Sequence, residues 1–242
     1  MAKYFVEEDS LTSVADAIRA KGGTSEPLSF PDGFVNAVEG IQAGGSGSDD
    51  SFTKLIEAII VDLSNDQATK VGAMLLKKCG TLKSVNLPNV ITLGADCFSG
   101  CSNLYAVNLP KLQTINGSCF LGTAVSALSF PKLVTVTGGS SFNGCSKLSF
   151  IDLGVNFASF YGNSVFAGCS LLSTVVLRNT TKIATLGNVS SFNNTPFASG
   201  RTGGTVYVPS ALIESYQTAT NWSTLYAAGT CNFVAIEGSE YE

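Results

Sequence analysis

Residues 97–110 read CFSGCSNLYAVNLP, and residues 142–153 repeat the same order as FNGCSKLSFIDL. In both stretches a phenylalanine is followed by a cysteine, a leucine and an apolar pair that encloses one polar residue. The copies of this pattern open on a large apolar side chain, at Leu76, Phe98, Phe120, Phe142 and Phe166. A pattern that returns at nearly constant spacing predicts a solenoid, in which each coil buries its apolar face against its neighbours.

The residue types within one copy predict the shape of one coil. Val85-Asn86-Leu87 alternates apolar and polar side chains, which predicts a short strand with one buried face. Pro88 cannot donate a hydrogen bond to a ladder and therefore ends this strand. A second short strand is expected within residues 90–93. The Phe-x-x-Cys segment then closes the coil, and we expect a turn of helix there with both side chains pointing inward.

The pattern weakens toward both ends of the array. Residues 55–76 carry a degraded copy, with a first strand predicted at Ile59, Val61 and Leu63; terminal repeats are usually atypical because they cover the exposed end of the stack. The stretch after Leu177 is long and polar, so we expect irregular coils anchored by Phe192 and Phe197. From about residue 205 we expect a cap, built from a strand at 206–208, a helix capped by Ser210 and a last strand near Phe233.

These motifs resemble the BspA-like leucine-rich repeats of bacterial surface proteins and of some gut-phage proteins. The resemblance rests on residues 97–104 with 107–110, and on residues 142–148 with 151–153, and it spans about residues 55–222. It implies a right-handed solenoid of short parallel strands joined by turns or short helices, an α/β repeat fold. It also implies a binding or adhesive role, with no catalytic residues to transfer.

The amino-terminal part of the chain has a different character. Residues 10–21 and a segment from Pro31 or Asp32 to Glu39 have the apolar spacing of two short helices, so residues 1–42 are expected to form a small helical hairpin. Such a hairpin is too small for a core of its own and is expected to mediate assembly with a partner. Residues 11–19 and 30–34 resemble a module that opens many phage and prophage tail-region proteins; the alternative is a generic hairpin. Residues 43–51 are a Gly/Ser-rich linker, and residues 52–242 the solenoid.

Composition and charge disfavour several classes of function. The net charge is −4, so a nucleic-acid partner held through its phosphates is not expected. No stretch has the roughly 20 apolar residues of a membrane span. Histidine is absent, which removes the commonest general base and histidine-containing metal sites. Residues 1–9 lack the pattern of a secretory signal. We therefore expect the protein to leave the cell by another route, for instance inside a phage particle; the alternative is a cell-surface location reached with an export signal that this sequence does not contain.

The cysteines follow the repeat. One column holds Cys79, Cys101, Cys145 and Cys169, with Thr123 in the place of a fifth, and a second column holds Cys97 and Cys119. A metal site, a disulfide and a buried ladder of small apolar side chains are the three interpretations. The spacing lacks the second ligand pair of a zinc site, and we therefore expect buried thiols that serve as packing. Cys231 has no counterpart in the repeat.

The outward residues at the strand centres form the candidate binding strip. This strip comprises Asp62, Asn86, Asn108, Ser129, Asp152 and Tyr207, with Phe150 in the neighbouring file as an aromatic contact. Such a strip of small polar groups beside apolar ones can receive a protein loop or a glycan, or can remain solvated.

Three hypotheses of function follow. The first is a non-enzymatic binding or structural protein that presents its repeat surface to a protein or carbohydrate, in a phage tail as its most concrete form. The second is a bacterial cell-surface adhesin. An enzyme ranks third, because Asp62 and Asp152 would lie too far apart to cooperate as paired carboxylates. No catalytic residue, metal or cofactor is therefore predicted.

Overall fold

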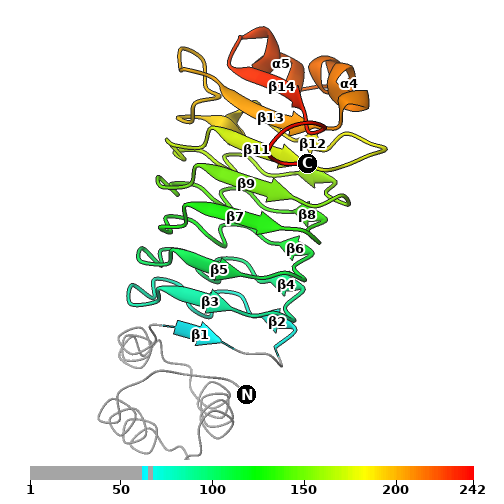
Figure 1. Cartoon of the computed structure of the whole chain (residues 1–242). Helices are drawn as coiled ribbons and strands as arrows, with labels where there is room; N and C mark the ends of the chain where they lie inside the picture. The colour runs from blue at the N-terminus through cyan, green and yellow to red at the C-terminus, as the bar shows by residue number, and fades with distance from the viewer. Residues whose placement is uncertain (1–61, 65–67) are drawn as a thin grey trace, which may run out of the picture.

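The computed structural model describes residues 62–64 and 68–242, which form one stack of coils closed by a helical cap (Figure 1). The predicted helical hairpin, residues 1–42, and the linker, residues 43–51, lie outside the described residues. Within the described part every strand pair is parallel. The predicted repeat solenoid of short parallel strands is confirmed.

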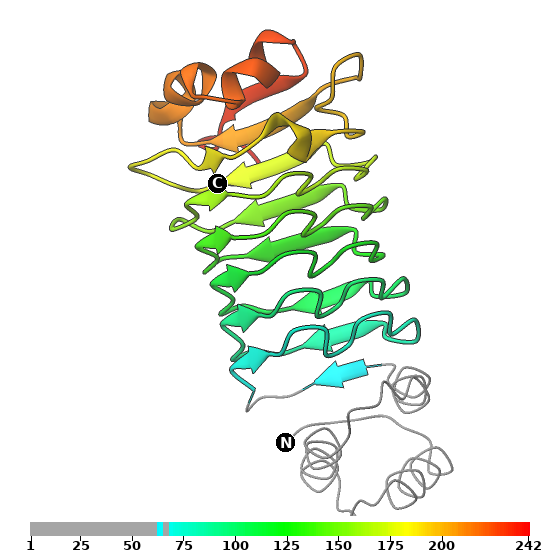
Figure 2. The same cartoon turned by 180° about the vertical axis from the view of Figure 1, so that it is seen from behind.

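Each coil supplies one strand to a long-strand sheet and one to a short-strand sheet, as both views show (Figures 1 and 2). The long-strand sheet contains β1 (Asp62–Ser64), β3 (Ser84–Asn86), β5 (Ala106–Asn108), β7 (Ala127–Phe130), β9 (Phe150–Leu153), β11 (Thr174–Leu177), β13 (Gly204–Val208) and β14 (Cys231–Ala235). The short-strand sheet contains β2 (Lys70–Val71), β4 (Thr92–Leu93), β6 (Thr114–Ile115), β8 (Thr135–Val136), β10 (Ser159–Phe160) and β12 (Thr185–Leu186).

Alternation of side chains fixes which face of each strand points inward. In β9, Ile151 and Leu153 are buried, whereas Phe150 and Asp152 point outward and stay partly exposed. The same alternation recurs in β7, and the inward side chains of successive coils meet between the two sheets. The predicted alternation therefore places the outward residues on one continuous surface of each coil.

In the coils that open at Leu76, Phe98, Phe120, Phe142 and Phe166, the closing segment is a pair of turns and contains no helix. In the coil that opens with Phe98, Asp96 and Gly100 both have positive φ, at 58° and 75°, and a residue in that conformation cannot continue a right-handed helix. The expected helical turn is therefore wrong, although Phe98 and Cys101 do point inward and are fully buried. The same pair of positive-φ positions recurs at Met74 and Lys78, Ser118 and Gly122, Ser140 and Gly144, and Ser164 and Gly168.

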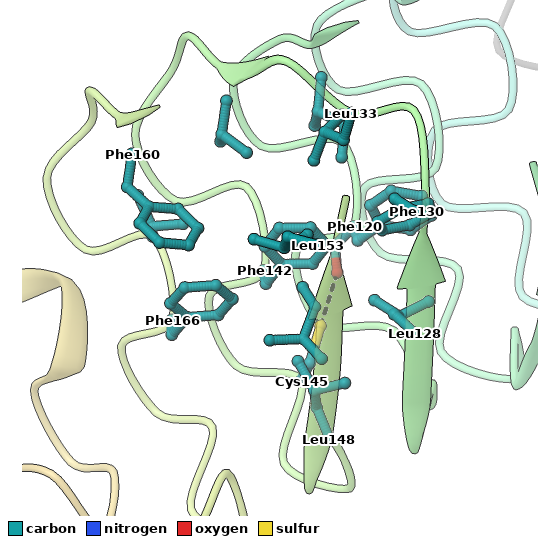
Figure 3. Close-up of a cluster of buried hydrophobic side chains, with 14 of the residues drawn as sticks. Phe120, Leu128, Phe130, Leu133, Phe142, Cys145, Leu148, Leu153, Phe160 and Phe166 are labelled. Atoms are coloured by element: carbon teal, nitrogen blue, oxygen red, sulfur yellow. Dashed lines mark hydrogen bonds between the residues drawn. The ribbon is translucent and has the colours of Figure 1, made fainter. Parts of the chain in front are cut away.

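A column of phenylalanine rings runs through the stack, and Figure 3 shows its central part. The Phe120 and Phe142 ring centroids lie 5.5 Å apart with planes 2° from parallel, and Phe142 and Phe166 are 5.3 Å apart. The column starts at Phe98 and continues past Phe166 to Phe192. Each fully buried phenylalanine contributes about 1.5–3 kcal/mol by leaving water, so the phenylalanine column is one of the main apolar contacts between coils.

The long-strand sheet is interrupted where the repeat loses one residue. β1, β3 and β5 form one part, and β7, β9, β11, β13 and β14 form the other. The short-strand sheet continues from β6 to β8 across the same two coils. Val107 in β5 is only partly buried, unlike its counterpart Ile151 in β9. The shorter coil therefore separates the two parts of one face without breaking the stack.

The first strand is shifted by two residues from its predicted register. Leu63 pairs with Val85, and Ser64 with Asn86, so Asp62 aligns with Ser84. The predicted strip requires Asp62 to lie beside Asn86, and this register is wrong. Alternation alone does not separate these registers, because a shift of two residues leaves the same side chains pointing inward. Asp62 consequently belongs to the file that contains Phe150 rather than to the file of Asn86.

The polar stretch after Leu177 forms a longer coil that still follows the stack. β12 pairs with β10 in the short-strand sheet, and a 3-10 helix, η1 (Val189–Phe192), occupies the closing segment. Phe192 and Phe197 are fully buried, which confirms them as anchors. Two of the extra residues lie between β11 and β12, and the other five lie between η1 and β13, where the chain returns to the register of the coils below.

The cap takes the place of the next short strand. Tyr216 of α4 (Ile213–Thr218) accepts a hydrogen bond from the Ala184 amide at 2.7 Å, and Trp222 of α5 (Trp222–Ala227) donates one to the Ala184 carbonyl at 2.8 Å. Asn221 donates to the Leu186 carbonyl at 2.7 Å. These side chains bond the backbone groups at the open edge of the short-strand sheet, which would otherwise be a template for pairing with another chain.

Two details of the cap differ from expectation. The short helix η2 (Ser210–Leu212) is preceded by Pro209, and the Ser210 side chain makes no capping hydrogen bond. Instead the Ser210 amide donates to the Glu237 carboxylate, at 2.9 Å to one oxygen. Trp222, expected just beyond a single helix, begins a second helix and extends the aromatic column, 5.9 Å from Phe192.

Close approach of successive turns generates a first prediction. A Cβ added to Gly138 would lie 2.2 Å from the Gly117 Cα, a backbone atom, whereas a Cβ added to Gly80 would meet nothing within 4 Å. Gly138→Ala should therefore lower the free energy of unfolding by about 1–3 kcal/mol. The matched Gly80→Ala variant should stay within about 0.5 kcal/mol of the parent. Chemical denaturation measures both, and equal stabilities for the two variants would contradict this tight stacking of turns.

Candidate functional site

The candidate binding strip is polar at its amino-terminal end. The Asn108 amide nitrogen donates to the Asn86 side-chain oxygen at 2.7 Å, and the Asn86 nitrogen lies 3.4 Å from the Ser64 hydroxyl. Ser64 therefore occupies the place that the sequence analysis gave to Asp62. Because each amide orients the next one, these exposed side chains are held in a fixed order along three strands.

Beyond the interruption the strip continues on the second part of the sheet. Ser129 aligns with Asp152, and Asp152 aligns with Val176, which in turn aligns with Tyr207. The predicted strip is therefore correct in order from Ser129 to Tyr207. Asn86 and Asn108 belong to the other part of the sheet, so the structure brings the predicted residues together as two groups.

Asp152 is bound to an arginine that follows β11. The Arg178 Nε donates to Asp152 Oδ1 at 2.9 Å, and Nη2 donates to Oδ2 at 3.1 Å. Both side chains are partly exposed, so this bidentate pair is a modest contribution to stability. The ion pair mainly limits the reactivity of Asp152, because both oxygens of this carboxylate, in the middle of the strip, already accept hydrogen bonds.

The carboxy-terminal end of the strip is aromatic. The ring of Tyr241 stacks on Phe150 with centroids 5.4 Å apart, and it packs edge-on against Tyr207 at 4.6 Å. Partial burial and the neighbouring Glu240 carboxylate raise the pKa of Tyr241, so its phenol stays protonated near neutral pH. Two of the predicted contact residues are thus already engaged by the chain itself.

Sequence reasoning missed Arg178 and Tyr241. Arg178 directly follows a predicted strand. A cation at that position could have been recognised as an ion-pair partner of Asp152, which lies one coil earlier. Tyr241 stands in a polar stretch with no periodicity, and its contact with Phe150 joins residues far apart in the chain. A local pattern carries no information about that contact.

The six cysteines of the two columns are buried thiols, as predicted, and Cys231, to which the sequence assigns no role, is buried too; within the described residues none is joined in a disulfide. Those of the main column reach back to the preceding coil: Cys145 donates to the Phe120 carbonyl at 2.9 Å (Figure 3), and Cys169 to the Phe142 carbonyl at 3.0 Å. Cys101 likewise donates to the Leu76 carbonyl at 3.0 Å. Thr123 differs, since its hydroxyl donates to the Phe120 carbonyl of its own coil.

Three of the buried thiols are poorly suited to ionise, whereas hydrogen bonding, first with Cys169, lowers the pKa of Cys145. Burial raises the pKa of Cys231 to about 12. Burial and then the neighbouring Cys119 raise the pKa of Cys97, while the adjoining Cys145 thiol and burial raise that of Cys169. Since the thiolate is both the nucleophile and the metal ligand, Cys97, Cys169 and Cys231 are suited to packing rather than to reaction.

Two further searches concern the described residues only. Over residues 62–64 and 68–242, no three His, Cys, Asp or Glu side chains gather in a way that could hold a metal ion. In that same part of the chain no helix has the length and apolar character needed to cross a membrane.

Comparison with known proteins places the repeat in a family and the fold among solved structures. Residues 69–197 match the BspA type leucine rich repeat region, in six copies. A solved structure of the pneumococcal vaccine antigen PcpA aligns with a TM-score of 0.53 and 16% identity, covering 72% of this chain and 41% of that one. The leucine-rich repeat protein of T. pallidum aligns at 0.46 with 18% identity, covering 72% of this chain and 86% of that one. No curated protein matches the sequence.

Burial of the thiols generates a second prediction. In the folded protein a water-soluble disulfide reagent at mildly alkaline pH should label none of the seven cysteines within minutes, because each thiol is buried and those with raised pKa values stay protonated. After unfolding in denaturant, without any reductant, all seven should react. Mass spectrometry counts the labels. Rapid labelling of Cys145 or Cys169 in the folded protein would contradict the buried column.

Proposed function

Because the chain belongs to the BspA-type leucine-rich repeat family, we propose that it is a non-enzymatic binding protein that presents the outer face of its long-strand sheet to a protein partner. A carbohydrate partner is the other class that such a face accommodates. The proposal rests on one observation above all, the ordered row of exposed amides at Asn86 and Asn108.

This row is suited to recognition because it is already ordered. Asn108 and Asn86 are exposed, yet each has a defined side-chain partner. Ordering exposed side chains on binding costs about 0.5–1.5 kcal/mol for each one that is immobilised. Amides that are held before the partner arrives reduce that cost, and they retain donors and acceptors for a partner's backbone or side chains.

The non-enzymatic part of the proposal follows from the acids on this face. Hydrolysis of a glycan by paired carboxylates requires one acid free to donate a proton and a second within several ångströms. Asp152 is engaged at both oxygens by Arg178. Asp62 lies at the other end of the stack, in the part of the sheet that is separated from β9.

A place in a phage tail is the finer form of this proposal. It is supported by the resemblance of residues 11–19 and 30–34 to a module of tail-region proteins, in which residues 1–42 would serve assembly and the linker would let the repeat domain reach its partner. The alternative is a bacterial cell-surface adhesin of BspA type. A chain lacking residues 1–51 distinguishes the two, because it should lose association with phage particles under the first proposal and keep full binding to cells under the second.

The location of the binding face generates a third prediction. The double variant Asn86→Arg/Asn108→Arg places two large cations on the outer face of the long-strand sheet and should reduce capture of a partner from solubilised bacterial envelope by at least about ten-fold, the effect of roughly 1.4 kcal/mol. The matched variant Thr92→Arg/Thr114→Arg alters the same two coils on the short-strand sheet and should bind like the parent. Equal loss in both variants, or loss only in the second, would contradict the assignment of the face.

A further inference from the structure

A small apolar cluster lies outside the core, on the outer face of β9, β11 and β13. Val176 points outward from β11, yet it is fully buried and does not belong to the core between the sheets. Something on the outer face must therefore cover it. Its neighbours across the strands are Asp152 and Tyr207, and Phe150 and Thr174 form the adjoining file.

Tyr241 is placed to cover it. Phe150 is on β9 and Tyr207 on β13, two strands apart with β11 between them. A ring that lies 5.4 Å from Phe150 and 4.6 Å from Tyr207 must span β11, and the Tyr241 hydroxyl reaches the Thr174 side chain of that strand. In both views the end of the chain lies beside the tip of β11 (Figures 1 and 2). The platform formed by Phe150, Val176 and Tyr207 thus already holds one tyrosine ring.

The segment that carries Tyr241 is built as a separate turn on a fixed base. Glu237 is the base, because its carboxylate accepts the Ser210 amide at 2.9 Å. Gly238 follows with a φ of +76°, a backbone conformation that favours glycine, and a Cβ added there would meet nothing within 4 Å. The backbone amides of Gly238, Ser239, Tyr241 and Glu242 all bond within residues 236–242. The aromatic ring is therefore the main attachment of this turn to the sheet.

We propose that this platform is a docking site for a tyrosine side chain of a partner protein, and that residues 238–242 occupy it until the partner displaces them. This inference rests on the proposed binding function. It assigns a ligand class, a tyrosine side chain, to one end of the same face, and it names residues 238–242 as the segment that blocks the site until the partner binds. Displacement would leave the coils and the cap unchanged, since the turn bonds mostly to itself.

The chemistry of the platform favours an aromatic side chain over a sugar. A ring is contacted in two preferred ways, face to face by Phe150 and edge-on by Tyr207, with the apolar Val176 beneath. A sugar would require several free polar side chains around the ring, and the charged pair next to the platform, Asp152 with Arg178, is closed on itself. Thr174 offers one hydroxyl, which matches one phenol.

The test uses the chain's own segment as a probe in trans. The full-length Tyr241→Ser variant should keep its fold, since Tyr241 lies on the surface, and should leave the platform open. A synthetic peptide of residues 236–242 should then shift the amide resonances of Phe150, Thr174 and Tyr207 in a titration. The peptide should bind the Tyr241→Ser variant on the order of ten-fold more tightly than it binds the parent. In the parent, Tyr241 is part of the same chain and competes with the peptide at a millimolar-range effective concentration.

Controls separate docking from non-specific contact. The same peptide with serine at position 241 should shift nothing. Adding Phe150→Ser to the open variant should abolish binding, whereas adding Tyr161→Ser, which removes an aromatic side chain that is 66% exposed away from the platform, should leave binding intact. Circular dichroism of each variant checks that the fold is retained.

Three outcomes would overturn the inference. They are no shift at the platform in the open variant, equal affinity of open and parent chains, or binding of soluble cell-wall saccharides at Phe150 and Tyr207 in place of the tyrosine peptide. The first two outcomes leave the proposed function untouched, because it is tested at Asn86 and Asn108, whereas saccharide binding would favour a carbohydrate partner for this face. The opposite result is also informative. If the peptide docks on the platform while the Asn86→Arg/Asn108→Arg variant still captures the partner, the displaceable segment is supported and the row of asparagines is rejected as the binding surface.

Discussion

Contact between the closing segments of successive coils is the constraint on which the whole structure depends. The phenylalanine of each coil stacks on the next at 5.3–5.7 Å, and the cysteine beside it donates to the carbonyl of the phenylalanine position one coil earlier. No coil has enough interior to be stable alone, so stability arises between neighbours. A ring and a small polarisable thiol fit this role because one supplies buried area and the other satisfies a buried carbonyl.

A stack of this kind must close its open end and must tolerate changes in coil length. The C-terminal end is closed by side chains, as Tyr216, Trp222 and Asn221 bond the backbone that a further strand would have paired. Changes in length are absorbed at the surface. The short coil before β7 splits the long-strand sheet, and the long coil before β12 extends a loop, while the aromatic column remains continuous from Phe98 to Trp222.

The parts of the fold that were predictable are those encoded by local residue type. Alternation in Val85-Asn86-Leu87 and the recurring Phe and Cys gave the strands, the inward residues and the stack. The turns were missed although a glycine recurs two residues after Phe98, Phe120, Phe142 and Phe166; only their partner positions at positive φ, such as Asp96 and Ser118, leave no clear signature in sequence. The register of Asp62 was missed because alternation repeats every two residues. At the candidate site, the order of Ser129, Asp152 and Tyr207 was predictable, but the cover by Tyr241 is a contact between distant parts of the chain and was not.

Removal of one whole coil tests the central claim most directly. A chain lacking residues 98–119 joins Cys97 to Phe120 and so recreates the Cys119–Phe120 junction, whereas a chain lacking only residues 98–108 leaves half a coil. If stability arises between interchangeable neighbouring coils, circular dichroism should show a β-rich spectrum for the first chain, which should unfold cooperatively with a somewhat lower free energy of unfolding. The second chain should be unfolded. An unfolded first chain, no better than the half-coil deletion, would contradict the account.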